Sequence, residues 1–336
     1  MSKRSEYTIL FFYVLLTAAL VMAMPFVGVS QIQIRDIISG ADPALSTIFW
    51  ELRLPRVILA FVVGAGLSLS GVIFQAFFRN DLASPFTLGI SSAAALGAAV
   101  YFKFAGTALL LGMMGAPASA FIGAIGGIAF IYLLSARDRR LEGNGLLLAG
   151  VALSFFCSSL VVFIQYIADV AEIFSITRWL MGSVETIGFE KVMMVTPVVL
   201  AAAAVTFLYG RELDLIAVGD EFAISRGVRV SRTRQILFAA ACLMVALIVS
   251  FCGVIGFVGI MVPHIARRLT GLSHRTLALS SFFIGGCLLM ACDALARIMI
   301  APSEIPVGVI TSIIGGPFFL LLLTTRVHRH GEAVAG

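Results

Sequence analysis

Apolar runs of about 20 residues recur along the whole of this 336-residue chain, and this feature limits its fold more than any other. A helix needs about 20 apolar residues to cross a bilayer, where only helices and closed barrels satisfy every backbone polar group. Hydrophobic residues make up 60% of the chain, whereas soluble domains are roughly 45 to 50% apolar. The pattern predicts an all-α integral membrane protein with a single transmembrane domain over residues 1–336.

Glycine, proline and charged residues divide the apolar sequence into about ten candidate transmembrane helices. Their approximate ranges are 7–27, 56–78, 85–102, 107–135, 145–167, 191–209, 234–252, 256–271, 277–300 and 305–325. The first is longer than the roughly 7 to 15 apolar residues of a signal-peptide core, so we expect it to be retained. The seventh and eighth form one helix or two, depending on whether the glycines of GVIGFVG at 253–259 turn the chain.

The distribution of Lys and Arg favours ten spans with both termini in the cytoplasm, because cytoplasmic loops carry the excess of these residues. Ten spans place 16 of the 23 basic residues on the inner side and seven on the outer side. Merging the seventh and eighth spans gives 12 against 11 instead. We therefore predict a tight outer turn near 253–256. The net charge of +5 is likewise attributed to basic residues at the two membrane sides, so nucleic acid is not expected as a partner.

Small residues at a spacing of four are frequent in the predicted spans, and such pairs let helix backbones approach closely in lipid. Examples are Gly64 with Ser68, Gly66 with Ser70, and Gly123 with Gly127. They predict a packed helical bundle and no particular chemistry.

The chain lacks the motifs of common catalytic and nucleotide-binding sites. No G-x-x-x-x-G-K-[ST] loop occurs, so ATP phosphates are not bound here through a P-loop. H-E-x-x-H, G-x-S-x-G and paired intramembrane carboxylates are absent too. The five cysteines lie in apolar segments without a C-x-x-C pair, which indicates buried thiols rather than disulfides or a metal site. We expect no enzyme activity, cofactor or metal in this chain.

The stretch RELDLIAVGDEFAISRGVRVSRTR at 211–234 is the longest predicted cytoplasmic loop. Gly219 followed by Asp220 and Glu221 is typical of a helix start, since acids stabilise the positive end of the helix dipole, and Gly227 is typical of a helix end. We predict a surface helix of about two turns. By composition alone, it fits a contact for a soluble motor subunit and a basic membrane anchor equally well.

Arginines gather at the predicted outer ends of the second and ninth spans. WELRLPRVILA at 50–60 places Arg53 and Arg56 before the second span, and Asp293 is positioned to pair with Arg297 four residues later on one helix face. Guanidinium groups bind carboxylates through two hydrogen bonds, so outward-facing arginines fit an acidic partner or an anionic substrate. The alternative is contact with membrane lipid headgroups.

GIMVPHIARRLTG at 259–271 carries polar residues at the inner end of the eighth span. His264 has no histidine, cysteine or carboxylate at ligand spacing, which argues against a catalytic role. Arg267 and Arg268 are expected to anchor the inner end of the helix. Pro263 removes one backbone donor and is expected to interrupt the helix, with His264 satisfying a freed polar group.

Four long segments carry a resemblance to a known family. They are RLPRVILAFVVGAGLSLSGVIFQAFFRNDLASPFTLGISSAAALGA (53–98), LLLAGVALS (146–154), GVIGFVGIMVPHIARRLTGLSHR (253–275) and EIPVGVITSIIGGPFFLLLL (304–323). They resemble the FecCD-type permease subunits of type II ABC importers, which take up ferric siderophores, haem and cobalamin. The resemblance runs over nearly the whole chain.

The resemblance implies a permease of the bacterial or archaeal cytoplasmic (inner) membrane that works with several partners. These would be a second copy of itself, two ATPase subunits that bind ATP and Mg, and a periplasmic or lipid-anchored substrate-binding protein. The cargo would be a bulky metal chelate, namely cobalamin, haem or a ferric siderophore, with molybdate-type oxyanions also open. The alternative is an ion-gradient-driven secondary transporter, which needs acids or histidines near mid-membrane. Asp169, Glu172 and Glu304 fall near predicted span ends instead.

The resemblance also assigns roles to particular positions. Arg53, Arg56 and Arg297 would face glutamates on the lobes of the binding protein. The segment 220–228 resembles the coupling helix that enters a groove of the ATPase, and its contact residues would be Asp220, Glu221, Ala223, Arg226, Gly227 and Val228. Asn80 and Leu82 match a cytoplasmic gate loop, and Gly143 and Asn144 lie near a second one.

Three short motifs depart from the family pattern. The usual Arg-Asn-Pro-Leu is RNDL at 79–82, so the gate loop gains a charge at Asp81 and lacks a rigid proline. The usual Ser-Leu-Gly-Val is SRGV at 225–228, which puts a cation at the motor contact. The usual Asp-His-Arg is SHR at 273–275, which argues against an essential acid at that position.

Overall fold

The protein is helical throughout the part of the chain that the computed structural model describes. These residues are 3–28, 33, 35, 37, 42–105, 109–137, 144–271 and 273–335. Helices coincide with all ten predicted spans: α1 (Lys3–Ala23), α4 (Leu54–Phe78), α5 (Ile90–Phe104), α6 (Leu109–Arg137), α7 (Asn144–Tyr166), α9 (Glu190–Leu208), α12 (Val230–Cys252), α13 (Val258–Thr270), α14 (His274–Ile298) and α15 (Val307–Ala335). The predicted all-α membrane fold is confirmed.

Six short helices lie between the long ones in the described residues. They are η1 (Met24–Phe26), α3 (Pro43–Thr47), η2 (Ile48–Arg53), α8 (Val170–Leu180), α10 (Gly210–Val218) and α11 (Asp220–Ser225). The sequence predicts only α11 among them. The others are too short to register as apolar spans, although α8 begins at a capping box formed by Asp169 and Glu172.

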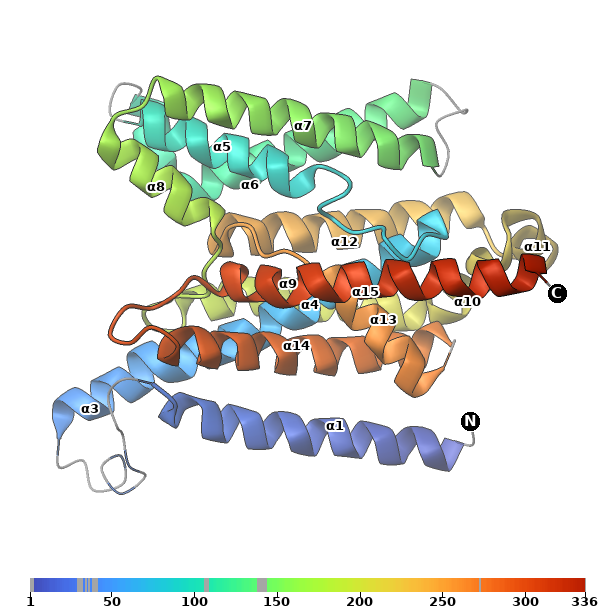
Figure 1. The fold of residues 1–336 in the computed structure, drawn as a ribbon, viewed down its shortest axis with the longest axis horizontal. Helices are drawn as coiled ribbons and strands as arrows, with labels where there is room; N and C mark the ends of the chain where they lie inside the picture. Colours follow the sequence, from blue (N-terminus) through green and yellow to red (C-terminus); the bar gives the residue numbers. More distant parts are fainter. Residues whose placement is uncertain are drawn as a thin grey trace.

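The long helices run side by side, and both ends of the chain lie at the same end of the bundle. Figure 1 shows the start of α1, the end of α15 and helix α11 at this end, with α3 and α8 at the opposite one. The arrangement agrees with the predicted cytoplasmic position of both termini and of the 211–234 loop. We therefore name these the cytoplasmic end and the outer end.

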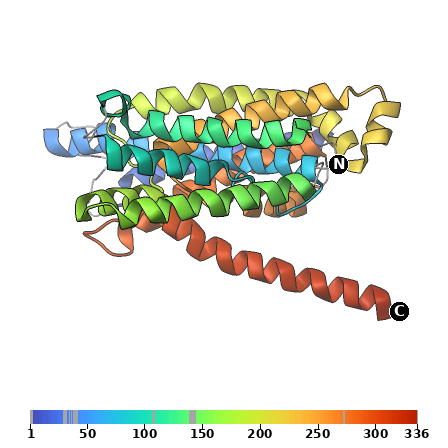
Figure 2. The same ribbon diagram turned by 90° about the horizontal axis from the view of Figure 1, so that it is seen from above.

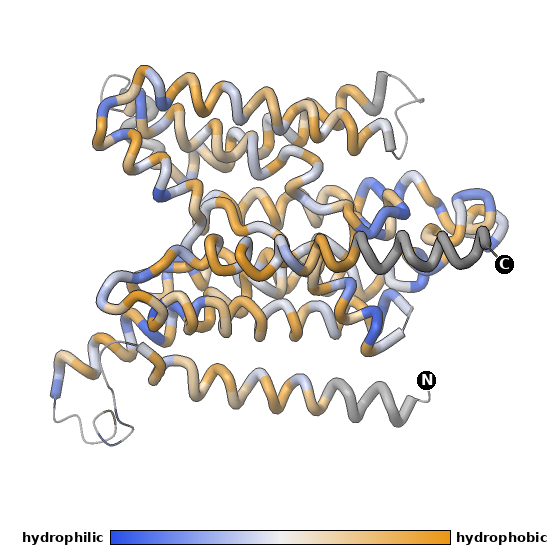
Figure 3. Tube along the Cα trace, in the orientation of Figure 1, coloured by the Kyte–Doolittle hydropathy of each residue, from blue (hydrophilic) through white to orange (hydrophobic). Residues whose placement is uncertain are grey.

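Apolar residues dominate the lengths of the helices, and polar residues gather at the two ends of the bundle (Figure 3). By length and composition, six described segments are able to cross a membrane: Pro43–Phe78, Gly115–Leu134, Gly145–Tyr166, Glu190–Leu208, Val230–Cys252 and His274–Ile298. Three shorter apolar helices accompany them: Phe11–Phe26, Ile90–Phe104 and Val307–Leu322. This distribution is that of a multi-pass membrane protein.

Helix α4 is the most buried span, and small residues let its neighbours approach it closely. A Cβ atom at Gly64 would collide with the backbone oxygen of Gly285 on α14, and one at Gly71 with that of Gly259 on α13. Ser68 donates a 2.6 Å hydrogen bond to a backbone oxygen of α14. The packing predicted from small residues at a spacing of four is therefore confirmed for Gly64 and Ser68.

A tight turn separates α12 from α13, as the charge distribution predicts. Helix α12 ends at Cys252, and α13 begins at Val258. Between them Gly253 has a φ of +67°, a conformation that glycine adopts at no steric cost. The turn gives the helices after it the orientation that the positive-inside rule requires.

Helix α15 leaves the bundle at an angle, whereas the other long helices run together (Figure 2). Its first turns are anchored by the buried side chains of Val307 and Ile310. Further along, Ile313, Leu320 and Leu321 are exposed. Lipid or another apolar surface is needed to cover this part of the helix.

Pro263 does not interrupt α13, which continues from Val258 to Thr270, so this expectation is wrong. The carbonyl that loses its backbone donor to a proline lies four residues earlier, at Gly259. The side-chain amide of Gln75 on α4 donates to the oxygens of Gly259 and Ile260, at 3.4 Å from each. The close approach of α4 and α13 makes this substitute bond possible.

His264 does not satisfy the freed carbonyl, which corrects a second expectation about this helix. Its Nε2 atom is buried and makes no hydrogen bond with the described residues. The ring packs edge-on against Phe318 of α15, with 6.1 Å between centroids. His264 therefore serves as a packing contact between α13 and α15.

Candidate functional site

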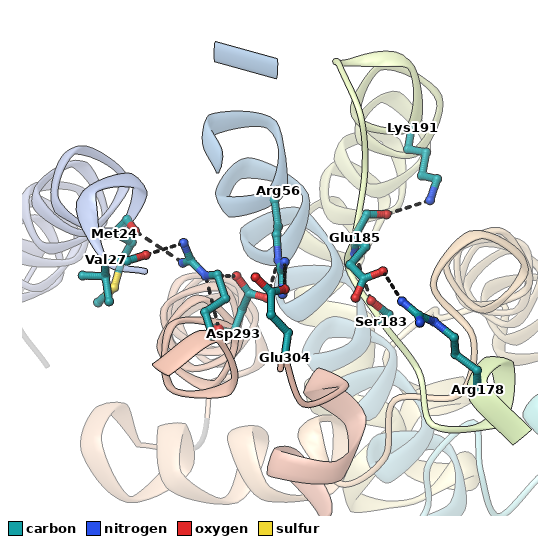
Figure 4. Close-up of polar contacts among 10 residues, drawn as sticks. Met24, Val27, Arg56, Arg178, Ser183, Glu185, Lys191, Asp293 and Glu304 are labelled. Carbon is teal, nitrogen blue, oxygen red and sulfur yellow. Dashed lines mark hydrogen bonds and ion pairs between the residues drawn. The ribbon is translucent and has the colours of Figure 1, made fainter. Parts of the chain in front are cut away.

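Three arginines and two acids form an ion network at the outer end of the bundle. We call these residues, Arg53, Arg56, Asp293, Arg297 and Glu304, the outer network. Arg56 Nε lies 2.8 Å from Asp293 Oδ1, and its Nη1 pairs with Glu304. Asp293 Oδ2 lies 3.2 Å from Arg297 Nε, which confirms the pair expected at this spacing. Figure 4 shows Arg56 directed at both acids.

Arg53 and Arg297 also hold the end of the first span. Arg53 Nη1 donates to the carbonyl of Pro25 at 3.1 Å. Arg297 donates through Nη1 to Val27 at 2.7 Å and through Nη2 to Met24 at 3.3 Å. The last carbonyls of a helix have no partner within it, and these guanidinium groups supply donors at this end of the first span. The carbonyl of Met24 also accepts from the N–H of Val27 at 3.2 Å.

The arginines of the outer network are buried rather than outward-facing. The exposed fractions of Arg53, Arg56 and Arg297 are 7%, 9% and 3%. A buried guanidinium group requires a paired acid and several acceptors, which Asp293 and the carbonyls after α1 provide. Because these groups do not extend toward the membrane surface, the alternative of lipid-headgroup contact is not supported.

All three arginines nevertheless line an open cleft of about 760 Å³ at the outer end. The other charged side chains of its lining are Glu185, Glu190, Lys191 and Glu304. Arg178 and Lys191 converge on Glu185, through its carboxylate at 3.0 Å and its backbone oxygen at 2.7 Å (Figure 4). The cleft is therefore a polar mouth that presents cations and carboxylates side by side.

Glu304 is the residue of this site to which sequence reasoning assigned no role. It lies in the loop between α14 and α15, with Pro306 two residues later. An acid in such a loop carries no motif, and only the fold brings it to Arg56, 248 positions away in the chain.

At the cytoplasmic end, α11 confirms the predicted short helix and its end at Gly227. The N–H of Gly227 donates to the carbonyl of Ile224 at 2.9 Å, and that of Val228 to Ala223 at 3.0 Å. Together with a φ of +84° at Gly227, these bonds form a Schellman motif. This motif requires glycine at position 227, because an L side chain is strained at that φ.

The side chains of α11 divide between anchoring the helix and facing outward. Ala223 is fully buried and packs with Ile216 and Val230, so it positions the helix instead of offering a contact. Glu221, Phe222, Ile224 and Arg226 are exposed. The guanidinium carbon of Arg226 lies 5.3 Å from the ring centroid of Phe222, which gives the added cation a local partner.

Asp220 ties α11 to the rest of the cytoplasmic end. Its carboxylate accepts from Arg234 of α12, with Oδ2 2.8 Å from Nη1, and also pairs with Arg79. Arg79 is the residue that caps the C-terminal end of α4, directly before the gate loop, and it donates through Nε to the carbonyl of Ile216 at 3.2 Å. The helix proposed to meet the ATPase is thus linked directly to the gate loop.

The gate loop after α4 is ordered by its own polar groups. The Asn80 side-chain oxygen accepts from the N–H of Leu82 at 3.0 Å, and the Asn80 carbonyl accepts from Ala83 at 3.0 Å. Asn144 is the first residue of α7, while Gly143 lies outside the described residues. The gate roles of these residues remain predictions.

Asp81 joins the gate loop to α13, which gives a physical meaning to this departure from the family pattern. Its Oδ1 lies 2.7 Å from Nη1 of Arg267, and Arg267 Nη2 donates to the Oε1 of Gln75 at 3.3 Å. Arg268, in contrast, is exposed. We call Gln75, Arg79, Asp81, Asp220, Arg234 and Arg267 the cytoplasmic network.

A further acid replaces the one missing at position 273. Asp214 of α10 accepts from both the N–H and the Nδ1 of His274, each at 2.7 Å. It therefore satisfies the first N–H of α14, one of the donors that have no partner within the helix, and holds the His274 ring. Sequence reasoning missed Asp214 because it lies 60 positions away.

No group of three or more His, Cys, Asp or Glu side chains in the described part of the chain is placed to hold a metal ion. The five cysteines are free, and four of them are buried. The described polar residues instead form ion pairs at the two ends of a helical membrane protein.

Comparisons with known proteins agree with this architecture. Residues 14–325 match the FecCD transport family. The chain is 36% identical over 326 residues to the hemin transport system permease protein HmuU of Yersinia pestis, covering 95% of this chain and 96% of that protein. It is 37% identical over 290 residues to the cobalamin import system permease protein BtuC of Halobacterium salinarum, covering 86% and 77%.

A solved structure described as an inward-facing ABC transporter of the metal-chelate type shares the fold, with a TM-score of 0.84 at 30% identity. The match covers 95% of this chain and 99% of that one. The order of the helices, the sequence match over residues 14–325 and this superposition lead to one conclusion. The chain belongs to the FecCD transport family and is the membrane-spanning permease subunit of an ABC importer, without catalytic activity of its own.

Proposed function

We propose that this permease imports a bulky metal chelate, of the haem, cobalamin or ferric-siderophore class, across the cytoplasmic membrane. The observation that carries the proposal is the pairing of two features in one bundle. A charged cleft opens at the outer end. The short helix α11, with exposed side chains, lies at the cytoplasmic end, where Figure 1 shows it. A subunit with a receiving surface and a motor surface on opposite sides suits ATP-driven import.

The outer cleft is proposed to receive a substrate-binding protein. Its lining carries Arg53, Arg56 and Arg297 beside Lys191, and guanidinium forks match carboxylates in geometry and charge. The volume of about 760 Å³ leaves room for several acidic side chains of a partner. Docking of this kind would deliver the chelate directly above the bundle.

Helix α11 is proposed to couple ATP hydrolysis to transport. It exposes Glu221, Phe222, Ile224 and Arg226 and is held from behind by the buried Ala223. Because Asp220 of α11 pairs with Arg79, a displacement of α11 would be transmitted to the end of α4 and to the gate loop. Two ATPase subunits with bound ATP and Mg, one beneath each permease copy, would drive this displacement.

A second copy of the chain is proposed to complete the pathway. Helix α15 diverges from the bundle and exposes Ile313, Leu320 and Leu321, which supports an apolar contact within the membrane (Figure 2). The family and the two relatives named for hemin and cobalamin transport support the proposed substrate class.

Uptake into vesicles tests the proposal. The permease is reconstituted with its ATPase and binding protein, and haem, cobalamin, a ferric siderophore and molybdate are offered in parallel with ATP inside. We expect uptake of one of the three chelates that requires all partners. Uptake of molybdate alone would overturn the substrate class. Uptake by the purified permease under an ion gradient without ATP would favour a secondary transporter instead.

A further inference from the structure

The two carboxylates that pair with Arg56 differ in their surroundings. Asp293 is fully buried between Arg56 and Arg297. Glu304 has a side chain that is 37% exposed, and it lines the outer cleft. Arg56 therefore has one permanent acidic partner and one that faces the open side of the site (Figure 4).

Displacing these two acids has very different costs. Removing Asp293 would leave the buried Arg297 without its acid and Arg56 with Glu304 alone, and uncompensated buried charges are strongly destabilising. Glu304 follows an exposed stretch, residues 298–303, that lies outside the core. A movement of its side chain into the cleft would hydrate the carboxylate and uncover little apolar surface.

The cleft carries little surplus charge when Glu304 is in place. Among the described residues of its lining, Arg53, Arg56, Lys191 and Arg297 are basic, and Glu185, Glu190 and Glu304 are acidic. Asp293, the partner of Arg56, and Arg178, the partner of Glu185, lie outside the lining and add one charge of each sign, so the cations exceed the acids by one. An acidic partner gains little Coulomb attraction from such a nearly neutral site, and the attraction increases when one internal acid moves away.

We propose that Glu304 is an exchangeable internal partner of Arg56. Its carboxylate pairs with Arg56 until an acidic side chain of the binding protein replaces it. The inference rests on the proposed docking function of the cleft. In the undocked permease Glu304 keeps Arg56 neutralised and oriented. On docking, the incoming carboxylate takes the Nη1 side of Arg56, while Asp293 continues to hold Nε.

The proposal predicts that neutralising Glu304 strengthens docking. Glu304→Gln keeps the size of the side chain and removes its charge. The carboxylate of the binding protein then no longer competes with an internal carboxylate for Arg56. We expect affinity for the binding protein to rise about two- to fivefold, the range of a partly exposed ion pair, with a steeper loss of binding at high salt.

The measurement is the affinity of the assembled permease–ATPase complex in nanodiscs for the binding protein that supports uptake, at low and high salt. Glu190→Gln is the matched control, because it removes the same charge from the same cleft. In the described residues Glu190 forms no ion pair with Arg56. We expect no comparable gain from this control.

Unchanged or weaker binding by Glu304→Gln would overturn the proposal, and so would an equal gain from Glu190→Gln, which would indicate a simple effect of net charge. Arg53→Gln separates this outcome from a failure of docking itself. This variant removes a cation of the cleft and leaves the Arg56–Asp293–Arg297 pairs intact. If Arg53→Gln also leaves binding unchanged, the docking function of the cleft is wrong as well.

Discussion

The ion networks at the two ends of the bundle use the same chemistry in different surroundings. The outer network is built around Asp293, which is fully buried between two guanidinium groups. In the cytoplasmic network the pair of Asp81 with Arg267 has side chains about a quarter exposed, and Asp220 is more exposed still. Burial makes the first network costly to break, whereas partial solvation lets the second rearrange at low cost.

This difference suits the positions of the two networks. The outer one ties the end of α1 to α14 and forms a fixed floor for the cleft, with Glu304 as its exchangeable part. The cytoplasmic one connects α11, the gate loop and α13, which are the elements expected to move when the pathway opens. The following predictions test the contrast in order of decreasing expected effect on stability.

The largest loss of stability is expected from Asp293→Asn. The change leaves Arg56 and Arg297 buried without their shared acid, and breaking a buried pair in this way costs about 3 to 5 kcal/mol. Thermal unfolding of the purified permease in nanodiscs measures it. Asp81→Asn is the control at the other end, and an equal loss in both variants would contradict the contrast.

A smaller loss is expected from Gln75→Leu. The leucine removes the donor to the carbonyl that Pro263 leaves free and the acceptor for Arg267, and unsatisfied buried groups cost about 1 to 3 kcal/mol each. Gln165→Leu, where the amide has a single 3.4 Å contact with Thr177, serves as the control. Unfolding at the wild-type temperature would mean that Gln75 does not replace the missing backbone bond.

The pair of Asp81 with Arg267 is expected to contribute only about 1 kcal/mol. A double-mutant cycle of Asp81→Asn and Arg267→Gln isolates this coupling energy from other effects of each change. We expect the coupling to shrink between low and high salt, because both side chains are partly solvated. A coupling energy larger than that of the buried Arg56–Asp293 pair in the outer network would contradict the comparison.

The smallest effect on stability is expected from Arg226→Glu, whose exposed side chain affects unfolding by about 0.5 kcal/mol or less. Transport per ATP hydrolysed should nevertheless fall several-fold, because the change reverses a charge on the proposed motor contact. Arg232→Glu on α12 controls for net charge. If transport per ATP hydrolysed is unchanged in both variants, α11 is only a surface anchor.

Much of the fold can be predicted from the sequence, because a bilayer requires long apolar helices and an excess of Lys and Arg in the inner loops. Runs of apolar residues predict ten ranges that coincide with helices of the structure, and the distribution of charge predicts the turn at Gly253. The short helix α11 was predicted from Gly219 and Gly227. Helices α8 and α10 were missed because short amphipathic helices at a membrane surface produce no apolar run.

The two sites were only partly predictable. The three outer arginines follow from their positions at the predicted ends of two spans. The pair of Asp293 with Arg297 follows from a spacing of four on one helix. The burial of the arginines, the role of Glu304 and the bond from Gln75 to the carbonyl freed by Pro263 do not. The contacts of Glu304 and Gln75 join residues 180 or more positions apart, and the contact of Arg53 with Pro25 joins residues 28 positions apart. No local sequence pattern predicts which of these residues are in contact.

The sequence by itself determined that the chain is a multi-pass helical membrane protein, because lipid requires apolar helices and charge sets their orientation. The family was indicated by the resemblance of four long segments. Only the tertiary structure decided which polar groups are paired. In a bilayer a buried polar group without a partner is costly, and close packing around Gly71 and Gly64 determines which partner is within reach. The same packing leaves Glu304 beside Arg56 and open to the cleft, and the proposed mechanism of docking depends on this placement.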